Sequence, residues 1–356
     1  MNTKSYDTLR DKWLAFWDME NHDRPLMSVY APSEKNDYST ISAPETTKER
    51  WFDLDFILKQ HRRNMNNTCF YGEAIPFACA NLGPDILGAI CGCDLIFGED
   101  TSWATHFVVD WDELEPIKFD PQNPWFLKIQ EITKMFLDDS NGEYLVGVTD
   151  LHPGMDGLVS MRGPEELCMD LYETPESIAP RVNQMFDVYK EVFLAQTRLI
   201  QDHQSGATNW MGVWHPDKNW YVSSCDFAAL ISLDHFDAFV LPGLLKELDF
   251  LPASIYHLDG PGALRTLDRL IEIPDLNGIQ WVPGAGNATP GGWIPIYKRI
   301  QAAGKCIVAN CEPSDVKILC EELQPEGLYI TCSVASESEA HDIIRMAESI
   351  CAGKRR

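Results

Sequence analysis

Short apolar runs of β-strand character alternate with longer helical runs along this sequence, and this alternation restricts the fold most strongly. We predict eight strands, over residues 26–30, 69–73, 144–150, 207–213, 254–257, 278–282, 306–310 and 328–332. Each of the last six is mostly apolar, as expected for a parallel strand buried on both faces. Eight strand–helix units predict a single (β/α)8 TIM barrel of the α/β class. A doubly wound open sheet is the alternative, but no glycine-rich phosphate turn follows any of these strands.

The predicted barrel forms one domain over residues 1–356, with two additions. Residues 1–25 form an N-terminal helical extension, in which Trp13, Phe16 and Trp17 alternate with charged residues. This pattern is typical of an amphipathic helix lying on the body rather than of a secretory signal. Residues 74–143 are too long for an ordinary connection after the second strand. We expect extra helices there and a short hairpin around residues 95–97 and 107–110, covering the barrel.

The composition excludes several classes of partner. The net charge is −25, from 29 basic and 54 acidic side chains, so the surface repels nucleic acid and anionic lipid. No stretch reaches the roughly 20 apolar residues that a membrane-spanning helix needs. The 11 cysteines are odd in number and lie in a chain without an export signal, which favours free thiols and a cytoplasmic location.

In a TIM barrel, side chains at the carboxyl ends of the strands face the working site. Four such residues are of types that bind zinc: His257, Asp259, Cys311 and Cys332. Ligands from separate strand ends can meet at the barrel mouth and leave one coordination position open for substrate. The alternative is that His257 is a hydrogen-bonding or general-acid residue, that Asp259 orients a loop, and that both cysteines only pack.

Other strand-end residues are candidates for catalysis and for substrate binding. Acid–base or orienting roles fall to Glu73, Asp150, His152, Asp156, His215 and His257. The alternative for several of these is helix capping or turn formation. Trp214, Tyr221 and Trp281 would form flat apolar walls for a planar ligand, or would only pack in the core. Arg162 would pair with Asp150 or Asp156, or hold a substrate carboxylate.

Several segments resemble the uroporphyrinogen decarboxylase-like superfamily. They are residues 158–167 (LVSMRGPEEL), 169–176 (MDLYETPE), 226–232 (DFAALIS) and 236–242 (FDAFVLP). The resemblance covers roughly residues 140–350 well and the N-terminal third weakly. It implies a TIM barrel with one of two chemistries, porphyrinogen decarboxylation or zinc-dependent methyl transfer that involves a corrinoid protein and a thiol. It is also compatible with a homodimer.

Two departures from the family pattern separate these chemistries. The decarboxylases grip their polycarboxylate substrate with an arginine-rich N-terminal segment, whereas residues 24–32 (RPLMSVYAP) carry no arginine after the strand begins. The methyltransferases carry His-x-Cys and a distant cysteine. The matching residues are His257, Asp259 and Cys332. Asp259 replaces a cysteine, and a carboxylate is a harder ligand than a thiolate, so the set is less suited to a soft thiolate substrate.

We therefore expect an enzyme with a small-molecule substrate. The first hypothesis is a zinc-dependent methyltransferase or demethylase whose corrinoid is supplied by a partner protein. A metal-free decarboxylase or lyase that uses Asp150, His152 and His257 is the second hypothesis. A non-catalytic binder of a tetrapyrrole or another planar ligand is the third.

Overall fold

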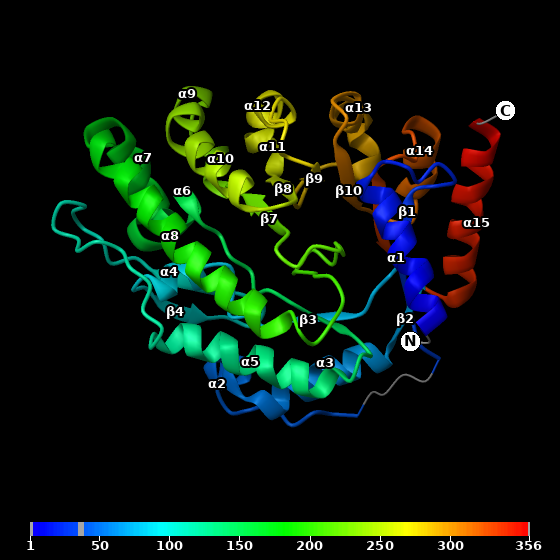
Figure 1. The fold of residues 1–356 in the computed structure, drawn as a ribbon, viewed down its shortest axis with the longest axis horizontal. Helices are drawn as coiled ribbons and strands as arrows, with labels where there is room; N and C mark the ends of the chain where they lie inside the picture. Colours follow the sequence, from blue (N-terminus) through cyan, green and yellow to red (C-terminus); the bar gives the residue numbers. More distant parts are fainter. Residues whose placement is uncertain (1–2, 35–38, 355–356) are drawn as a thin grey trace.

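A computed structural model of the chain describes residues 3–34 and 39–354 as an α/β fold built on a mostly parallel sheet (Figure 1). The main sheet has seven strands in the order β2-β1-β11-β10-β9-β8-β7. Six of them are parallel: β1 (Leu26–Pro32), β7 (Tyr221–Ser224), β8 (Ser254–Asp259), β9 (Gly278–Val282), β10 (Cys306–Asn310) and β11 (Leu328–Ser333). Strand β2 (Thr68–Gly72) is antiparallel to β1.

A second small sheet continues the parallel arrangement. It pairs β3 (Phe77–Cys79) with β6 (Leu145–Gly147), and an isolated parallel bridge joins Val148 to Asn209. Together the two sheets contain eight strands that are parallel to a neighbour in their own sheet, which is consistent with a TIM-like barrel. Among the residues described, however, the two sheets are not joined by strand ladders into a closed barrel.

Two predicted strands differ from the observed ones. The run at residues 69–73 forms β2, but it pairs antiparallel with β1, so β3 takes its place in the parallel series. Residues 207–213 form turns with isolated bridges. The strand that follows β6 in the chain is instead β7 at Tyr221–Ser224. The reason lies partly in Gly206 and Gly212, which both have φ +73°, a backbone angle that interrupts an extended strand.

Helices pack around the strands (Figure 1). The N-terminal helix α1 (Thr3–Trp17) is present as predicted, and residues 1–2 lie outside the described part. The other α-helices are α2 (Thr47–Phe52), α3 (Leu54–Asn66), α4 (Ile86–Ile90), α5 (Pro124–Ser140), α6 (Gly154–Arg162), α7 (Pro164–Glu173), α8 (Pro175–Ile200), α9 (Leu233–His235), α10 (Leu241–Phe250), α11 (Gly260–Ala263), α12 (Leu267–Ile271), α13 (Ile294–Ala302), α14 (Asp315–Glu322) and α15 (Glu337–Lys354). No helix in residues 3–34 or 39–354 combines the length and the apolar character that membrane crossing requires.

The segment between β3 and β6 contains α4, α5 and a hairpin, in agreement with the predicted extra helices. The hairpin joins β4 (Asp94–Phe97) to β5 (Ser102–Thr105), so its first strand lies where the sequence predicted it and its second lies several residues earlier.

The strands separate two layers of buried side chains. On one side, which we call the inner face, Ile255, Val308 and Tyr329 pack with Trp13 and Phe16 of α1. The side chains next to them in sequence belong to the larger core between the strands and the surrounding helices, on what we call the outer face. Since successive side chains of a strand point to opposite sides, position along the strand decides the face.

Candidate functional site

Histidine and aspartate side chains gather at the carboxyl ends of β6, β7 and β8. Asp150 and His152 follow β6, Asp226 follows β7, and His257 and Asp259 belong to β8. The possible ligand atoms of Asp226, His257 and Asp259 all lie within 4.8 Å of one another, and so do those of His152, Asp156 and Asp226. Four of the residues in these two groups were predicted as site residues, and the structure brings them together.

His152 lies between carboxylates that hold it in the charged form. Its Nε2 is 3.0 Å from Asp150 Oδ1, and its Nδ1 is 3.7 Å from Asp156 Oδ2 and 3.0 Å from the hydroxyl oxygen of Ser224. Burial lowers the pKa of His152, but Asp150 and Asp156 together raise this pKa well above its ordinary value. Because both ring nitrogens are engaged, His152 acts as a cation within the acidic cluster rather than as a ready metal ligand.

Asp156 connects this histidine to the end of β7. Its carboxylate accepts hydrogen bonds from the backbone N–H groups of Asp226, at 2.9 Å, and Phe227, at 3.0 Å. These bonds fix the backbone where Asp226 leaves the strand. Burial and then the nearby Asp156 carboxylate raise the pKa of Asp226 to about 6. A bound cation would stabilise the ionised form of this carboxyl group, which the neighbouring carboxylate disfavours.

His257 is oriented by two neighbours. Its Nδ1–H donates to Oε1 of Gln280, on β9, at 2.6 Å. The ring of Trp210 meets the imidazole edge-on, with 5.2 Å between the ring centroids. The bond to Gln280 fixes the tautomer in which Nε2 carries a lone pair, as in histidines that bind metal ions. One imidazole and two carboxylates fit a catalytic zinc or a harder divalent cation with an open position.

The two predicted sulfur ligands lie elsewhere. Cys332 follows the inner-face residue Tyr329 by three positions, so its side chain belongs to the outer face, where it is 4% exposed in the main core. Cys311 packs against the same core. Within the described ranges, no group of three ligand side chains at this spacing includes a cysteine. The four predicted ligands therefore do not form one site. His257 and Asp259 are grouped with Asp226, and Cys311 and Cys332 lie apart from them.

Asp226 and Gln280 were absent from the predicted site. Asp226 comes two residues after β7, a position that the incorrect strand at 207–213 concealed. Gln280 lies within a correctly predicted strand, two residues before its end. An inward-facing amide in an otherwise apolar strand was the one signal that could have identified it.

Three predicted site residues lie at the amino ends of the strands instead. Glu73 accepts from the backbone N–H of Met27 at 3.0 Å and pairs with Arg24 and Lys12. Trp214 accepts at its carbonyl from Trp17 of α1, and His215 packs against the Trp17 ring at 4.7 Å. Since α1 covers this end, none of the three reaches the acidic cluster.

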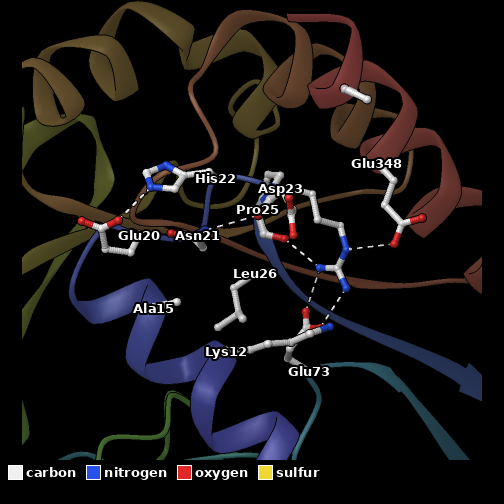
Figure 2. Close-up of a pocket in the computed structure, with 12 residues that line it drawn as sticks. Lys12, Ala15, Glu20, Asn21, His22, Asp23, Pro25, Leu26, Glu73 and Glu348 are labelled. Carbon is white, nitrogen blue, oxygen red and sulfur yellow. Dashed lines mark hydrogen bonds and ion pairs between the residues drawn. The ribbon is translucent and has the colours of Figure 1, made fainter. Parts of the chain in front are cut away.

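A cavity of about 430 Å³ lies at this amino end, between α1 and α15, and it contains the pair formed by Glu73 and Arg24 (Figure 2). Arg24 forms ion pairs with Glu73 and with Glu348, and Figure 2 shows Lys12 beside Glu73. All three nitrogens of the Arg24 guanidinium donate in these bonds and in one to Pro25 O. The cavity is lined by side chains that bind one another, so we assign these contacts to stability.

The predicted aromatic walls and the predicted arginine have structural roles. Tyr221 and Trp281 are each 1% exposed, as is Trp214, so they belong to the core and form no wall for a planar ligand. Arg162 pairs with Asp170, through bonds of 2.7 and 2.9 Å, and with neither Asp150 nor Asp156. It is thus already engaged and is not positioned to hold a substrate carboxylate.

Comparisons with known proteins agree with this architecture. No protein-family model matches the sequence, and no curated protein matches it. Among solved structures, a methyltransferase from Methanosarcina mazei is similar, with a TM-score of 0.56, 12% identity, and coverage of 98% of this chain and 99% of that chain. A B12-independent methionine synthase from Shewanella sp. W3-18-1 in complex with selenomethionine has a TM-score of 0.43 and 10% identity, over 94% and 95% of the two chains. The first match confirms, at the level of the fold, the resemblance predicted from the sequence.

Proposed function

We propose that this protein is a methyltransferase that binds one zinc ion through Asp226, His257 and Asp259. The observation that carries the proposal is the bond from His257 Nδ1 to Gln280, because it leaves a lone pair on Nε2 of a histidine that is grouped with two carboxylates. The fold shared with a methyltransferase supports the choice of reaction. Bound zinc would act as a Lewis acid toward a thiol, or toward the leaving oxygen or nitrogen of a methylated substrate.

The remaining residues of the cluster prepare the site. Asp156 holds the backbone of Asp226 in place, and Gln280 holds the imidazole of His257. The cationic His152, which Asp150 and Ser224 orient, offers a proton to a leaving group that enters from the strand ends. We further propose that a corrinoid protein docks over the strand ends as the other partner in methyl transfer.

The charge of the site argues against a polycarboxylate substrate. Asp150, Asp156, Asp226 and Asp259 place four carboxyl groups near the reacting position, and His152 is the cation that faces them. Arg162 is bound to Asp170. A substrate with many carboxylates would meet repulsion here, which makes porphyrinogen decarboxylation a poor fit.

The test is metal content together with methyl transfer. We expect about one zinc per purified chain, and transfer between methylcobalamin and a small thiol that is followed by corrinoid absorbance. His257→Ala and Asp226→Asn should lose both. Asp138→Asn, which changes an exposed acid on α5, is the matched control and should lose neither. Full metal content in His257→Ala would overturn the proposed ligand set.

A metal-free lyase or decarboxylase is the second candidate, and the pair formed by Asp150 and His152 favours it. A carboxylate 3.0 Å from a partly buried imidazole is an arrangement used in general acid–base catalysis. This candidate predicts turnover that a chelator does not change and that His152→Gln abolishes. Activity that a chelator removes and zinc restores would exclude it.

A further inference from the structure

Two thiols occupy neighbouring positions at the ends of β10 and β11. Asn310 and Thr331 are paired across the two strands, and the N–H of Cys311 donates to the carbonyl of Thr331 at 2.9 Å. The next pair in this parallel register is Cys311 and Cys332. Neighbouring strands lie about 4.8 Å apart, which is within the Cα separation that one bridging group between two cysteines can span.

Both thiols belong to the same face of the sheet and line the same cavity. Each packs on the outer face, Cys332 within the main core and Cys311 at its margin. They line a cavity of about 360 Å³ together with Tyr30, Thr289, Glu312 and Ser333. The two thiols interact, since Cys332 raises the pKa of Cys311 further above the value that burial alone produces.

A second thiol pair provides a comparison within the same chain. Cys320 of α14 and Cys351 of α15 interact through their side chains and are 0% and 2% exposed. That pair lies between packed helices, whereas Cys311 and Cys332 border an open cavity. Of these two pairs, it is Cys311 and Cys332 that line a cavity.

We propose that Cys311 and Cys332 form a dithiol site for a soft, thiophilic metalloid, such as a monosubstituted trivalent arsenical. The ligand binds as its hydrated form, which carries two As–O bonds. Both thiols lose their protons, two As–S bonds form, two As–O bonds break, and two water molecules leave with no change in oxidation state.

The surroundings select this chemistry over a zinc site. In the described part of the chain, no third histidine, cysteine or carboxylate joins the two thiols within 4.8 Å. A structural zinc ion needs four ligands, whereas an arsenical that retains its organic group needs only two more. The site is separate from the proposed zinc ligands, because none of Asp226, His257 and Asp259 lines the cavity that the two thiols border.

The probe is phenylarsine oxide, added to the full-length protein as purified. We expect one tight adduct per chain, seen by intact mass, and protection of Cys311 and Cys332 together from iodoacetamide, seen by peptide mapping. A small dithiol should displace the adduct and a monothiol should not. Cys311→Ser or Cys332→Ser should weaken binding by at least about 100-fold, because closing the second bond is intramolecular.

The control is Cys168→Ser, which removes an isolated half-buried thiol on α7 and should leave binding unchanged. Protection mapping uses the unaltered protein, so it gives an answer even if a variant fails to fold. Protection of Cys320 and Cys351 in place of the proposed pair, or displacement by a monothiol, would overturn the proposal. Neither result depends on zinc or on methyl transfer.

Discussion

His257 and Cys332 lie on opposite faces of one parallel sheet. His257 follows Ile255 by two positions, and Ile255 packs on the inner face with α1. Cys332 follows Tyr329 by three positions, so its thiol joins the core beneath the helices. A histidine and a cysteine can therefore share a metal ion only if they lie at the same end of the strands and their side chains also point to the same face of the sheet.

This relationship predicts that the sulfur of Cys332 is dispensable for metal binding. Cys332→Ala should retain about one zinc per chain, whereas Asp259→Asn should lose it, because the carboxylate and not the thiol stands beside Asp226 and His257. Elemental analysis of both purified variants measures this. Loss of zinc in Cys332→Ala at unchanged fold, judged by circular dichroism, would contradict the arrangement.

Gln280 should control metal affinity without touching the metal ion. Gln280→Leu removes the acceptor of the His257 Nδ1–H at nearly constant volume, so the tautomer is no longer fixed. We expect zinc affinity to fall about 10- to 100-fold, the usual cost of losing such a partner. Gln280→Glu keeps an acceptor and should retain tight binding. Competition with a chromophoric chelator gives both affinities, and equal values for the two variants would refute this role.

Much of the fold was predictable because most parallel strands are buried on both faces. The runs that form β8, β9, β10 and β11 are mostly apolar, and each predicted strand overlaps an observed one. The run at residues 207–213 is similarly apolar, but it forms turns and isolated bridges instead of a strand. Its side chains, among them Met211 and Val213, pack with α1 on the inner face. Tertiary packing against a helix distant in sequence cannot be read from local pattern.

The candidate site was only half predictable, for a geometric reason. Sequence spacing placed Asp150, His152, His257 and Asp259 near strand ends, where they are found. Spacing could not show to which face of the sheet the side chain of Cys332 points. Nor could spacing show that Glu73 lies at the amino ends of the parallel strands. It lies there because β2 runs antiparallel to β1 and ends beside the start of β1.

Arg24 should be essential for stability because it neutralises a buried carboxylate. The Glu73 side chain is 1% exposed, and despite its burial Arg24 and Lys12 lower the pKa of Glu73. Arg24→Leu leaves that charge with only the half-exposed Lys12, so the free energy of unfolding should fall by about 3 kcal/mol. Urea denaturation measures the change. Adding Glu73→Leu should recover most of the loss, and a double variant no more stable than Arg24→Leu would contradict the explanation.

Glu247 should make the protein less stable as the pH rises. Burial first, and then the Asp156 carboxylate, raise the pKa of Glu247 from 4.5 to about 8. Between these values the folded state keeps a proton that the unfolded state has released, so the free energy of unfolding decreases with increasing pH. Glu247→Gln, which cannot ionise, should flatten that decrease. Urea midpoints at several pH values test this, with Glu191→Gln, an exposed change on α8, as the control that keeps the wild-type slope.

Two tyrosines allow one substitution to be compared in two environments. The hydroxyl of Tyr221 accepts from the N–H of Leu151 at 2.9 Å and donates to the carbonyl of Thr149, on either side of Asp150. Tyr221→Phe leaves both buried backbone groups without that partner. It should lower the free energy of unfolding by about 1–3 kcal/mol.

Tyr256 is as deeply buried, at 1% exposed, but its hydroxyl has no hydrogen-bond partner among the residues described. Tyr256→Phe removes an unpaired polar atom, so we expect stability to be unchanged or to rise slightly. Urea denaturation of the two variants side by side measures the difference. Equal losses would mean that the packing contacts of the deleted hydroxyl, rather than the hydrogen bonds that hold the Asp150 turn, determine the cost. A loss in Tyr221→Phe alone would establish that this hydroxyl fixes the backbone from which Asp150 and His152 enter the site.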